Sequence, residues 1–244
     1  MLKTDLDAVK RTAIRLLYTE IHLTEFSPVV VQHPFTSSGF AMVKKNGNSE
    51  LVDITADEKN ADLWRQAVKE QIEKAKNAFE IYMMTNKPYG MTFLKFVASY
   101  LSMEDYSAIL SDAWIRSENP NNDPNLPQNK LIEMFMSADK TYLMTEEEQE
   151  IYEELTTVVT VYRGVTSYNA DNVRALSWTL DEEVAEWFSE RFDEDGTVYQ
   201  ANIHKNHVLA YFGGRNEAEV VVDPKFLFDI TAVEEQEESL DLTM

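Results

Sequence analysis

The chain has 244 residues, of which 44% are hydrophobic and 11% aromatic, enough apolar material for one large or two small globular domains and too much for a disordered chain. The formal net charge is −21, and residues 151–244 carry 6 basic and 20 acidic side chains against 16 and 23 in residues 1–150. Because nucleic acid is held largely by Lys and Arg on its phosphates, this balance disfavours DNA or RNA and favours a protein partner with a basic patch.

Cysteine is absent, which excludes disulfides and thiolate metal sites, and the four histidines lack metal-ligand spacing. No apolar run approaches the roughly 20 residues of a membrane span, and charges interrupt the N-terminus where a secretory signal would be apolar. We therefore expect no metal, no membrane association and a cytoplasmic location.

The first part of the chain predicts helices and one hairpin. Residues 5–18 and 57–84 have apolar positions at helical spacing, and residues 92–101 and 103–116 continue the pattern. Short strands are expected at 29–31, 40–43 and 51–54, the last two joined by the turn Asn46-Gly47. Residues 1–150 are thus predicted to form a mainly helical region with a small β-hairpin.

The pattern changes after a proline-rich stretch, residues 119–129, which predicts a long surface loop. Thr145 and Glu148 have capping-box spacing and predict a helix to about residue 155. Beyond it we expect a helix at 181–192 among strands at 157–163, 197–203, 207–212, 218–223 and 226–231. The predicted fold class is α+β, with a second domain at 151–233 and a solvated acidic tail at 234–244.

Two carboxylates stand two residues apart at the entrance to a β-branched run. Alternate side chains of a strand share a face, so Glu217 and Glu219 are expected to point the same way. By itself such a pair is weak evidence, because an acidic strand edge is common on a chain this negative.

Three segments within residues 157–231 resemble, in order, the arginine, serine, glutamate (R-S-E) pattern of the ADP-ribosyltransferase superfamily. They are Val-Tyr-Arg-Gly at 161–164, Leu-Ser-Trp-Thr at 176–179 with its following helix, and Glu-Ala-Glu-Val-Val-Val at 217–222. The middle segment departs from the usual pattern, because Trp178 and Thr179 stand where Thr and Ser are common. The resemblance is to mono-ADP-ribosyltransferases of phages and bacterial toxins, and it implies the cytoplasm of a bacterium or of a phage-infected host cell. It implies a split-β-sheet domain that moves ADP-ribose from NAD to a macromolecule and releases nicotinamide, without a metal.

The resemblance also assigns roles on the NAD side of the site. An arginine fork suits a phosphate or the adjacent ribose, so Arg163 is expected to hold NAD, with Gly164 allowing close approach of the backbone. Ser177 supports the site by hydrogen bonding, and Trp178 and Thr179 are further cofactor-side candidates. A buried structural ion pair is the alternative for Arg163.

On the catalytic and acceptor side, Glu219 is expected to stabilise the positive charge that develops on the ribose during glycosidic cleavage. Glu217 would orient or deprotonate the acceptor, and a Glu here implies arginine side chains, with a host protein as the first expectation. Phe212 and Arg215, in a glycine-hinged loop, are candidates for contacting the acceptor; the alternative is a tight turn with Phe212 in the core.

Three other functions stay open. An NAD glycohydrolase would use water as the acceptor, and some relatives modify nucleic acid. A degenerate transferase fold serving as a phage structural or binding module would cleave no NAD.

Overall fold

The computed structural model describes residues 3–25, 27–45, 47–118, 125–191 and 196–233. The chain divides into two compact units, Met1–Leu143 and Met144–Met244, which are described separately. The acidic tail and most of the proline-rich loop, for which the sequence carried predictions, lie outside the described residues.

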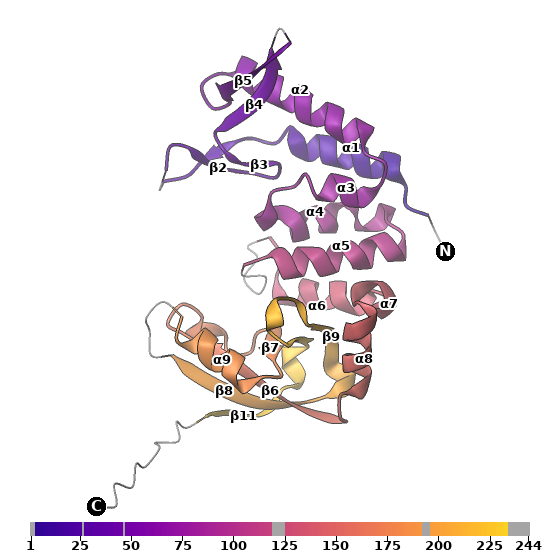
Figure 1. Cartoon of the computed structure of the whole chain (residues 1–244), viewed down its shortest axis with the longest axis vertical. Helices are drawn as coiled ribbons and strands as arrows, with labels where there is room; N and C mark the ends of the chain where they lie inside the picture. Colours follow the sequence, from indigo (N-terminus) through magenta and orange to yellow (C-terminus); the bar gives the residue numbers. More distant parts are fainter. Residues whose placement is uncertain (1–2, 26, 46, 119–124, 192–195, 234–244) are drawn as a thin grey trace, which may run out of the picture. The chain divides into compact units, whose positions relative to one another are not determined.

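The first unit is mainly helical (Figure 1). Its helix α1 packs against α2, α3 and α4, while α5 packs against α3, α4 and α7. The helices are α1 (Leu6–Leu17), α2 (Glu58–Lys74), α3 (Ala78–Tyr82), α4 (Gly90–Val97), α5 (Met103–Arg116), α6 (Gln128–Ser137) and α7 (Lys140–Leu143), with 3-10 turns η1 (Lys87–Tyr89) and η2 (Ala98–Tyr100).

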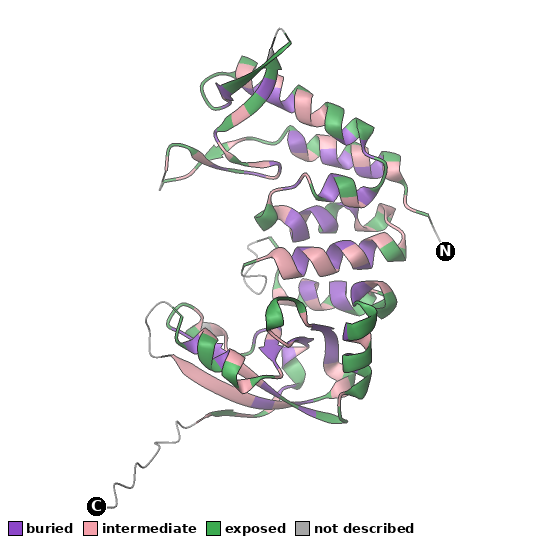
Figure 2. Cartoon of the chain, in the orientation of Figure 1, coloured by how far each residue is buried: buried purple, intermediate pink, exposed green. Residues whose placement is uncertain are grey.

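Helix α1 begins where the sequence predicts. The Asp5 side chain caps it by accepting a hydrogen bond from the Ala8 amide at 2.9 Å. Val9, Ala13 and Leu17 then recur on one face and are fully buried (Figure 2). The amphipathic pattern therefore placed both the helix and its core side.

The predicted long helix over 57–84 is two helices. Helix α2 ends at Lys74 because the next residue, Ala75, turns to an extended ψ of 139°. Asn77 then starts α3 by accepting from the Glu80 amide at 2.8 Å. An Asn with a helix-capping option competes with a continuous helix even where the apolar period continues.

Two small sheets accompany these helices. Strands β4 (Phe40–Lys45) and β5 (Asn48–Asp53) form the expected hairpin, and Gly47 provides its left-handed turn with φ 83°. The other sheet has the order β1-β2-β3 and uses β1 (His22–Leu23), β2 (Val30–His33) and β3 (Thr36–Ser38).

The second unit is built on one six-stranded sheet of order β11-β8-β6-β7-β10-β9, in which every described pairing is antiparallel. Its elements are α8 (Glu146–Glu154), β6 (Val158–Val165), η4 (Ala170–Asn172), β7 (Ser177–Thr179), α9 (Glu182–Ser189), β8 (Thr197–His204), η5 (Lys205–His207), β9 (Val208–Phe212), η6 (Gly214–Asn216), β10 (Glu219–Val222), η7 (Pro224–Phe226) and β11 (Phe228–Ala232). Helix α9 packs on β6 and β8 (Figure 1). The α+β class is confirmed.

Helix α8 belongs to this second unit, so the division falls before the predicted position at 150. The helix opens with the expected capping box of Thr145 and Glu148. It packs on β9, and the Tyr152 hydroxyl donates a hydrogen bond to the Val208 carbonyl at 3.0 Å. The local sequence predicts the helix itself. Which of the two units the helix belongs to depends on its contacts with strands some fifty residues later in the chain. No helix in the described ranges has both the length and the apolar character needed to cross a membrane.

His33 links three elements of the first unit. It is fully buried, its Nδ1 accepts from the Phe35 amide at 3.1 Å, and its Nε2 lies 3.2 Å from the Leu17 carbonyl. Trp64 of α2 meets its ring edge to face. Burial lowers the pKa of His33 from 6.5 to about 4, with the nearby charge of Arg65 acting in the same direction.

This depressed pKa makes the first unit sensitive to mild acid. Above pH 6.5 the ring is neutral in both states, but between pH 6.5 and about 4 the unfolded chain binds the extra proton. The free energy of unfolding should therefore fall by about 3 kcal/mol more across this window than in His33→Phe. Native-state amide hydrogen exchange in α1 and β2 measures this free energy in the unmodified chain and in His33→Phe. If the free energy changes with pH in the same way in both, the lowered pKa of His33 is contradicted.

Candidate active site

The sheet of the second unit brings together residues that are far apart in sequence. Strand β7 lies between β6 and β10, and its Thr179 is opposite Tyr162 on one side and Glu219 on the other. Arg163, next to Tyr162, and Ser177, two residues before Thr179, consequently lie beside the start of β10. Strand pairing thus assembles the arginine, serine and glutamate that the sequence singled out.

Hydrogen bonds link these three residues through Ser177. The Arg163 guanidinium donates from Nη1 to the Ser177 carbonyl at 2.6 Å. The Ser177 hydroxyl donates to Glu219 Oε1 at 2.5 Å. Glu219 is only 7% exposed, so its carboxylate is held inside the unit. Ser177 therefore connects the other two residues, through its carbonyl to Arg163 and through its hydroxyl to Glu219.

Arg163 is held in an environment that is costly for a cation. Burial lowers the pKa of Arg163 to about 10, and the negative charge of Glu219 opposes this shift. Its Nε atom is buried and has no hydrogen-bond partner among the described residues. A buried N–H without an acceptor is uncommon. Arg65 Nε and Thr92 Oγ1 of the first unit are likewise buried without a hydrogen-bond partner in the described part of the chain.

Glu217 and Glu219 do not share a strand face, contrary to the sequence expectation. Strand β10 begins only at Glu219, and the intervening Ala218 has a left-handed φ of 42°. Glu219 consequently points into the sheet, whereas Glu217 lies in the preceding turn, with 21% of its side chain exposed. The two carboxylates thus differ in burial and in partners.

Glu217 forms an ion pair with Arg215. The Nη2 of Arg215 is 3.0 Å from Oε2 of Glu217, and the Arg215 side chain is half exposed. No other hydrogen bond or ion pair of the Glu217 carboxylate occurs within the described ranges. The carboxylate predicted to receive an acceptor therefore already binds a guanidinium from its own chain.

The turn between β9 and β10 is fixed at both ends. At its start the Gly213 amide donates to Glu148 Oε1 at 2.9 Å, and at its end the Thr179 hydroxyl donates to the Glu217 carbonyl at 2.7 Å. Between these clamps, Arg215 and Asn216 have φ values of 65° and 56°. Such left-handed residues cost about 1–3 kcal/mol each and persist only where surrounding contacts impose them.

Glu148 is the residue that sequence reasoning missed at this site. Its carboxylate accepts from Thr145 within the capping box and also from Gly213 in the turn. The sequence reveals the first contact through the Thr-x-x-Glu spacing. Nothing local indicates the second, which depends on α8 packing beside β9.

The structure gives core or supporting roles to the other candidates. Trp178 is 2% exposed, pairs with Val220, and donates its indole N–H to the Ala175 carbonyl; alternation along β7 directs it away from the Ser177 side. Phe212 is 1% exposed at the end of the fully buried β9, so it does not present an aromatic surface to an acceptor. The Thr179 hydroxyl also accepts from the amide of Asp181, the residue that caps α9.

At Gly164 the close approach is made by a helix of the same unit. A Cβ there would lie 2.1 Å from the Ala185 carbonyl oxygen and 2.5 Å from the Ser189 amide. The glycine that was expected to admit the cofactor therefore allows α9 to pack on β6, next to Arg163.

Comparisons with protein-family models, curated proteins and solved structures returned no match for this chain. Within the described residues, no group of three or more His, Cys, Asp or Glu side chains is placed to hold a metal ion.

Because α9 packs so closely on Gly164, one added methyl group there should lower the stability of the second unit strongly. Gly164→Ala should destabilise the second unit by about 2 kcal/mol or more, because backbone atoms of α9 must move. Gly214→Ala is the matched control, since a Cβ there meets nothing within 4 Å. Urea unfolding of both variants measures the difference, and equal stabilities would show that α9 does not lie against β6 as described.

Proposed function

We propose that the second unit is a mono-ADP-ribosyltransferase of the R-S-E type, which moves ADP-ribose from NAD to a macromolecular acceptor and releases nicotinamide. The observation that carries the proposal is the hydrogen-bonded series Arg163, Ser177 and Glu219, with a guanidinium-binding Glu217 beside it. The antiparallel sheet that assembles these residues is consistent with the split-sheet transferase domain implied by the sequence.

Arg163 fits an anionic dinucleotide. Its Nη1 is used by the protein, but the buried Nε has no acceptor of its own among the described residues. The guanidinium would have to turn for a phosphate or ribose oxygen to reach that N–H, and the new contact would offset the cost of the largely buried cation. When bound, NAD would supply the ADP-ribosyl group and nicotinamide as the leaving group.

Glu219 would act by position and charge. Cleavage of the nicotinamide glycosidic bond develops positive charge on the ribose, and a fixed carboxylate nearby lowers that barrier. The Ser177 hydroxyl holds one oxygen of Glu219 at 2.5 Å, so little rearrangement is needed during the reaction. The role of Ser177 is to position this carboxylate.

Glu217 would receive the acceptor and take its proton. Its ion pair with Arg215 supports arginine as the acceptor class, because the carboxylate is both accessible and able to bind a guanidinium. An incoming arginine would use the other oxygen of Glu217 or displace Arg215. The charge of residues 151–244, with 20 acidic and 6 basic side chains, would attract a basic protein. Such an acceptor would be a host protein in the cytoplasm.

The same ion pair also favours a second candidate, an NAD glycohydrolase. While Arg215 occupies Glu217, water is the simpler acceptor. This enzyme would release nicotinamide without labelling any macromolecule.

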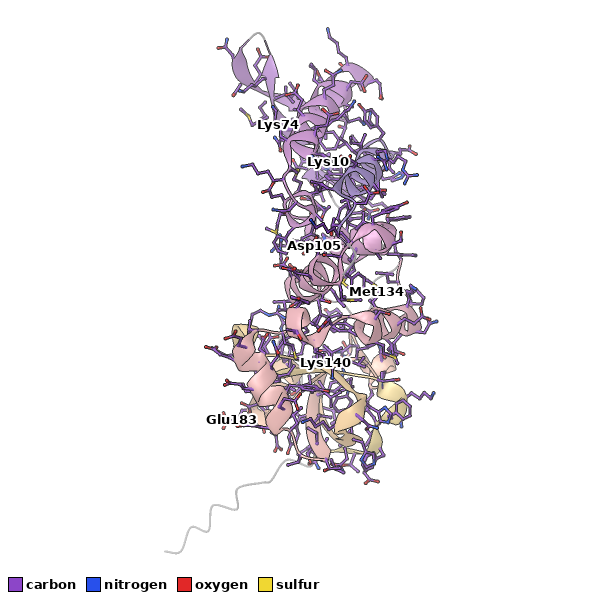
Figure 3. The ribbon with its side chains drawn as sticks, turned by 90° about the vertical axis from the view of Figure 1, so that its right-hand side faces the viewer. Lys10, Lys74, Asp105, Met134, Lys140 and Glu183 are labelled. Atoms are coloured by element: carbon purple, nitrogen blue, oxygen red, sulfur yellow. The ribbon has the colours of Figure 1, made fainter. Side chains whose placement is uncertain are left out.

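Removal of the Glu219 charge should abolish NAD cleavage. Glu219→Gln keeps a similar shape and hydrogen-bonding capacity, and should lower the rate of nicotinamide release by about 100-fold or more. Glu183→Gln removes an exposed carboxylate of α9 and is the matched control (Figure 3). Nicotinamide release is measured by chromatography, and equal rates for the two variants would refute the site.

Removal of the Glu217 charge should affect transfer of ADP-ribose to the acceptor more than cleavage of NAD. Glu217→Gln is expected to lower transfer to a small guanidine acceptor at least about tenfold, while nicotinamide release falls much less. Both products are measured in the same reaction. If transfer and release fall in parallel, Glu217 does not select the acceptor.

A further inference from the structure

An open pocket of the first unit is lined by residues of α1 and α2 together with Tyr100 of η2. Its volume is about 600 Å³, which lies in the usual range for small-molecule sites. The pocket is lined by Ala8, Arg11, Thr12, Ile14, Arg15, Lys69, Glu73 and Tyr100. Three cations thus face one carboxylate, on a chain with 43 acidic and 22 basic side chains.

The two arginines of this pocket lack the partners that other arginines have. Arg11 makes no hydrogen bond or ion pair within the described ranges, and Arg15 donates only to the neutral Thr12 hydroxyl at 3.1 Å. The remaining arginines each contact a carboxylate, a carbonyl oxygen or an aromatic ring: Arg65, Arg116, Arg163, Arg174, Arg191 and Arg215.

The spacing of the pair also needs an explanation. Arg11 and Arg15 are one helical turn apart on α1 and therefore lie on the same face, where like charges repel by about 0.2–0.5 kcal/mol. An anion between them would turn this repulsion into two charge-assisted contacts. Lys69 could join them, because its ion pair with Glu73 is long at 3.8 Å.

We propose that this pocket binds a small organic phosphate. Arg11 and Arg15 would hold the phosphate with their planar forks, and Lys69 would add a third charge from α2. Ala8, Ile14 and the Tyr100 ring provide an apolar surface for the organic part of the ligand. The site is independent of the proposed transferase activity, since every lining residue belongs to the first unit.

The observations favour a small ligand over a polynucleotide. A nucleic-acid strand needs a continuous track of Lys and Arg, whereas the cations of this pocket are accompanied by Glu73 in the lining and by Glu70 on the same helix α2. Two lysines of the same helices, Lys10 and Lys74, already have partners. Lys10 donates to the Glu73 carbonyl at 2.8 Å, and Lys74 pairs with Glu70; both lysines are labelled in Figure 3.

The test is calorimetric titration of the full chain with inorganic pyrophosphate and with ADP. The double variant Arg11→Gln/Arg15→Gln should weaken binding of both by about tenfold or more, because charge-assisted contacts are lost. Lys59→Gln/Lys76→Gln is the charge-matched control: both lysines are exposed, belong to the same unit and lie outside the pocket lining. This control should bind like the unmodified chain.

A variant that is expected to bind more tightly shows that weaker binding in the arginine variant is not caused by loss of folding. Glu73→Gln removes the only carboxylate of the pocket lining and frees Lys69, so binding of pyrophosphate should tighten severalfold. Absence of saturable binding of both probes at millimolar concentration would overturn the proposal, as would unchanged binding in the arginine double variant. A labelled single-stranded oligonucleotide that binds more tightly than either probe, and is lost in that variant, would replace it with a polynucleotide site.

Discussion

A buried carboxylate, Glu219, imposes the strongest constraint on the second unit. Placing such a group inside a protein costs several kcal/mol unless hydrogen bonds and an opposite charge accompany it. Ser177 and Arg163 provide these, each from a different strand of the sheet. Apolar residues of similar volume often stabilise such a position at least as well, so stability alone does not account for a carboxylate here.

The backbone directly before Glu219 is also strained, which costs free energy of folding. Arg215, Asn216 and Ala218 all have left-handed backbones, which the clamps at Glu148 and Thr179 maintain. The result is that Glu217 stands out of the sheet and meets a guanidinium, while Glu219 points inward. A regular strand would have put both carboxylates on one face with similar surroundings. The turn therefore gives two neighbouring glutamates different burial and different partners.

The sequence correctly predicted those elements that depend on neighbouring residues alone. Alternation and helical period located β6, β8, β9 and α1, and Thr-x-x-Glu spacing located the start of α8. It could not predict that Ala218 would break the strand, nor that Glu148 would reach Gly213, because tertiary contacts impose both. For Phe212 the sequence left acceptor contact and core open, and for Trp178 it suggested the cofactor side. Both are buried, because strand alternation and packing place an aromatic side chain, and proximity in sequence to a candidate residue does not.

The central claim is that the Arg163, Ser177 and Glu219 site breaks the glycosidic bond of NAD and passes on the ADP-ribose. The most direct measurement incubates the full chain and a bacterial lysate with NAD labelled in its adenine or, separately, in its nicotinamide. The account predicts that adenine label enters the protease-sensitive macromolecular fraction while nicotinamide label appears only as free nicotinamide. Intact NAD at the end of the incubation, with no label transferred, would contradict it.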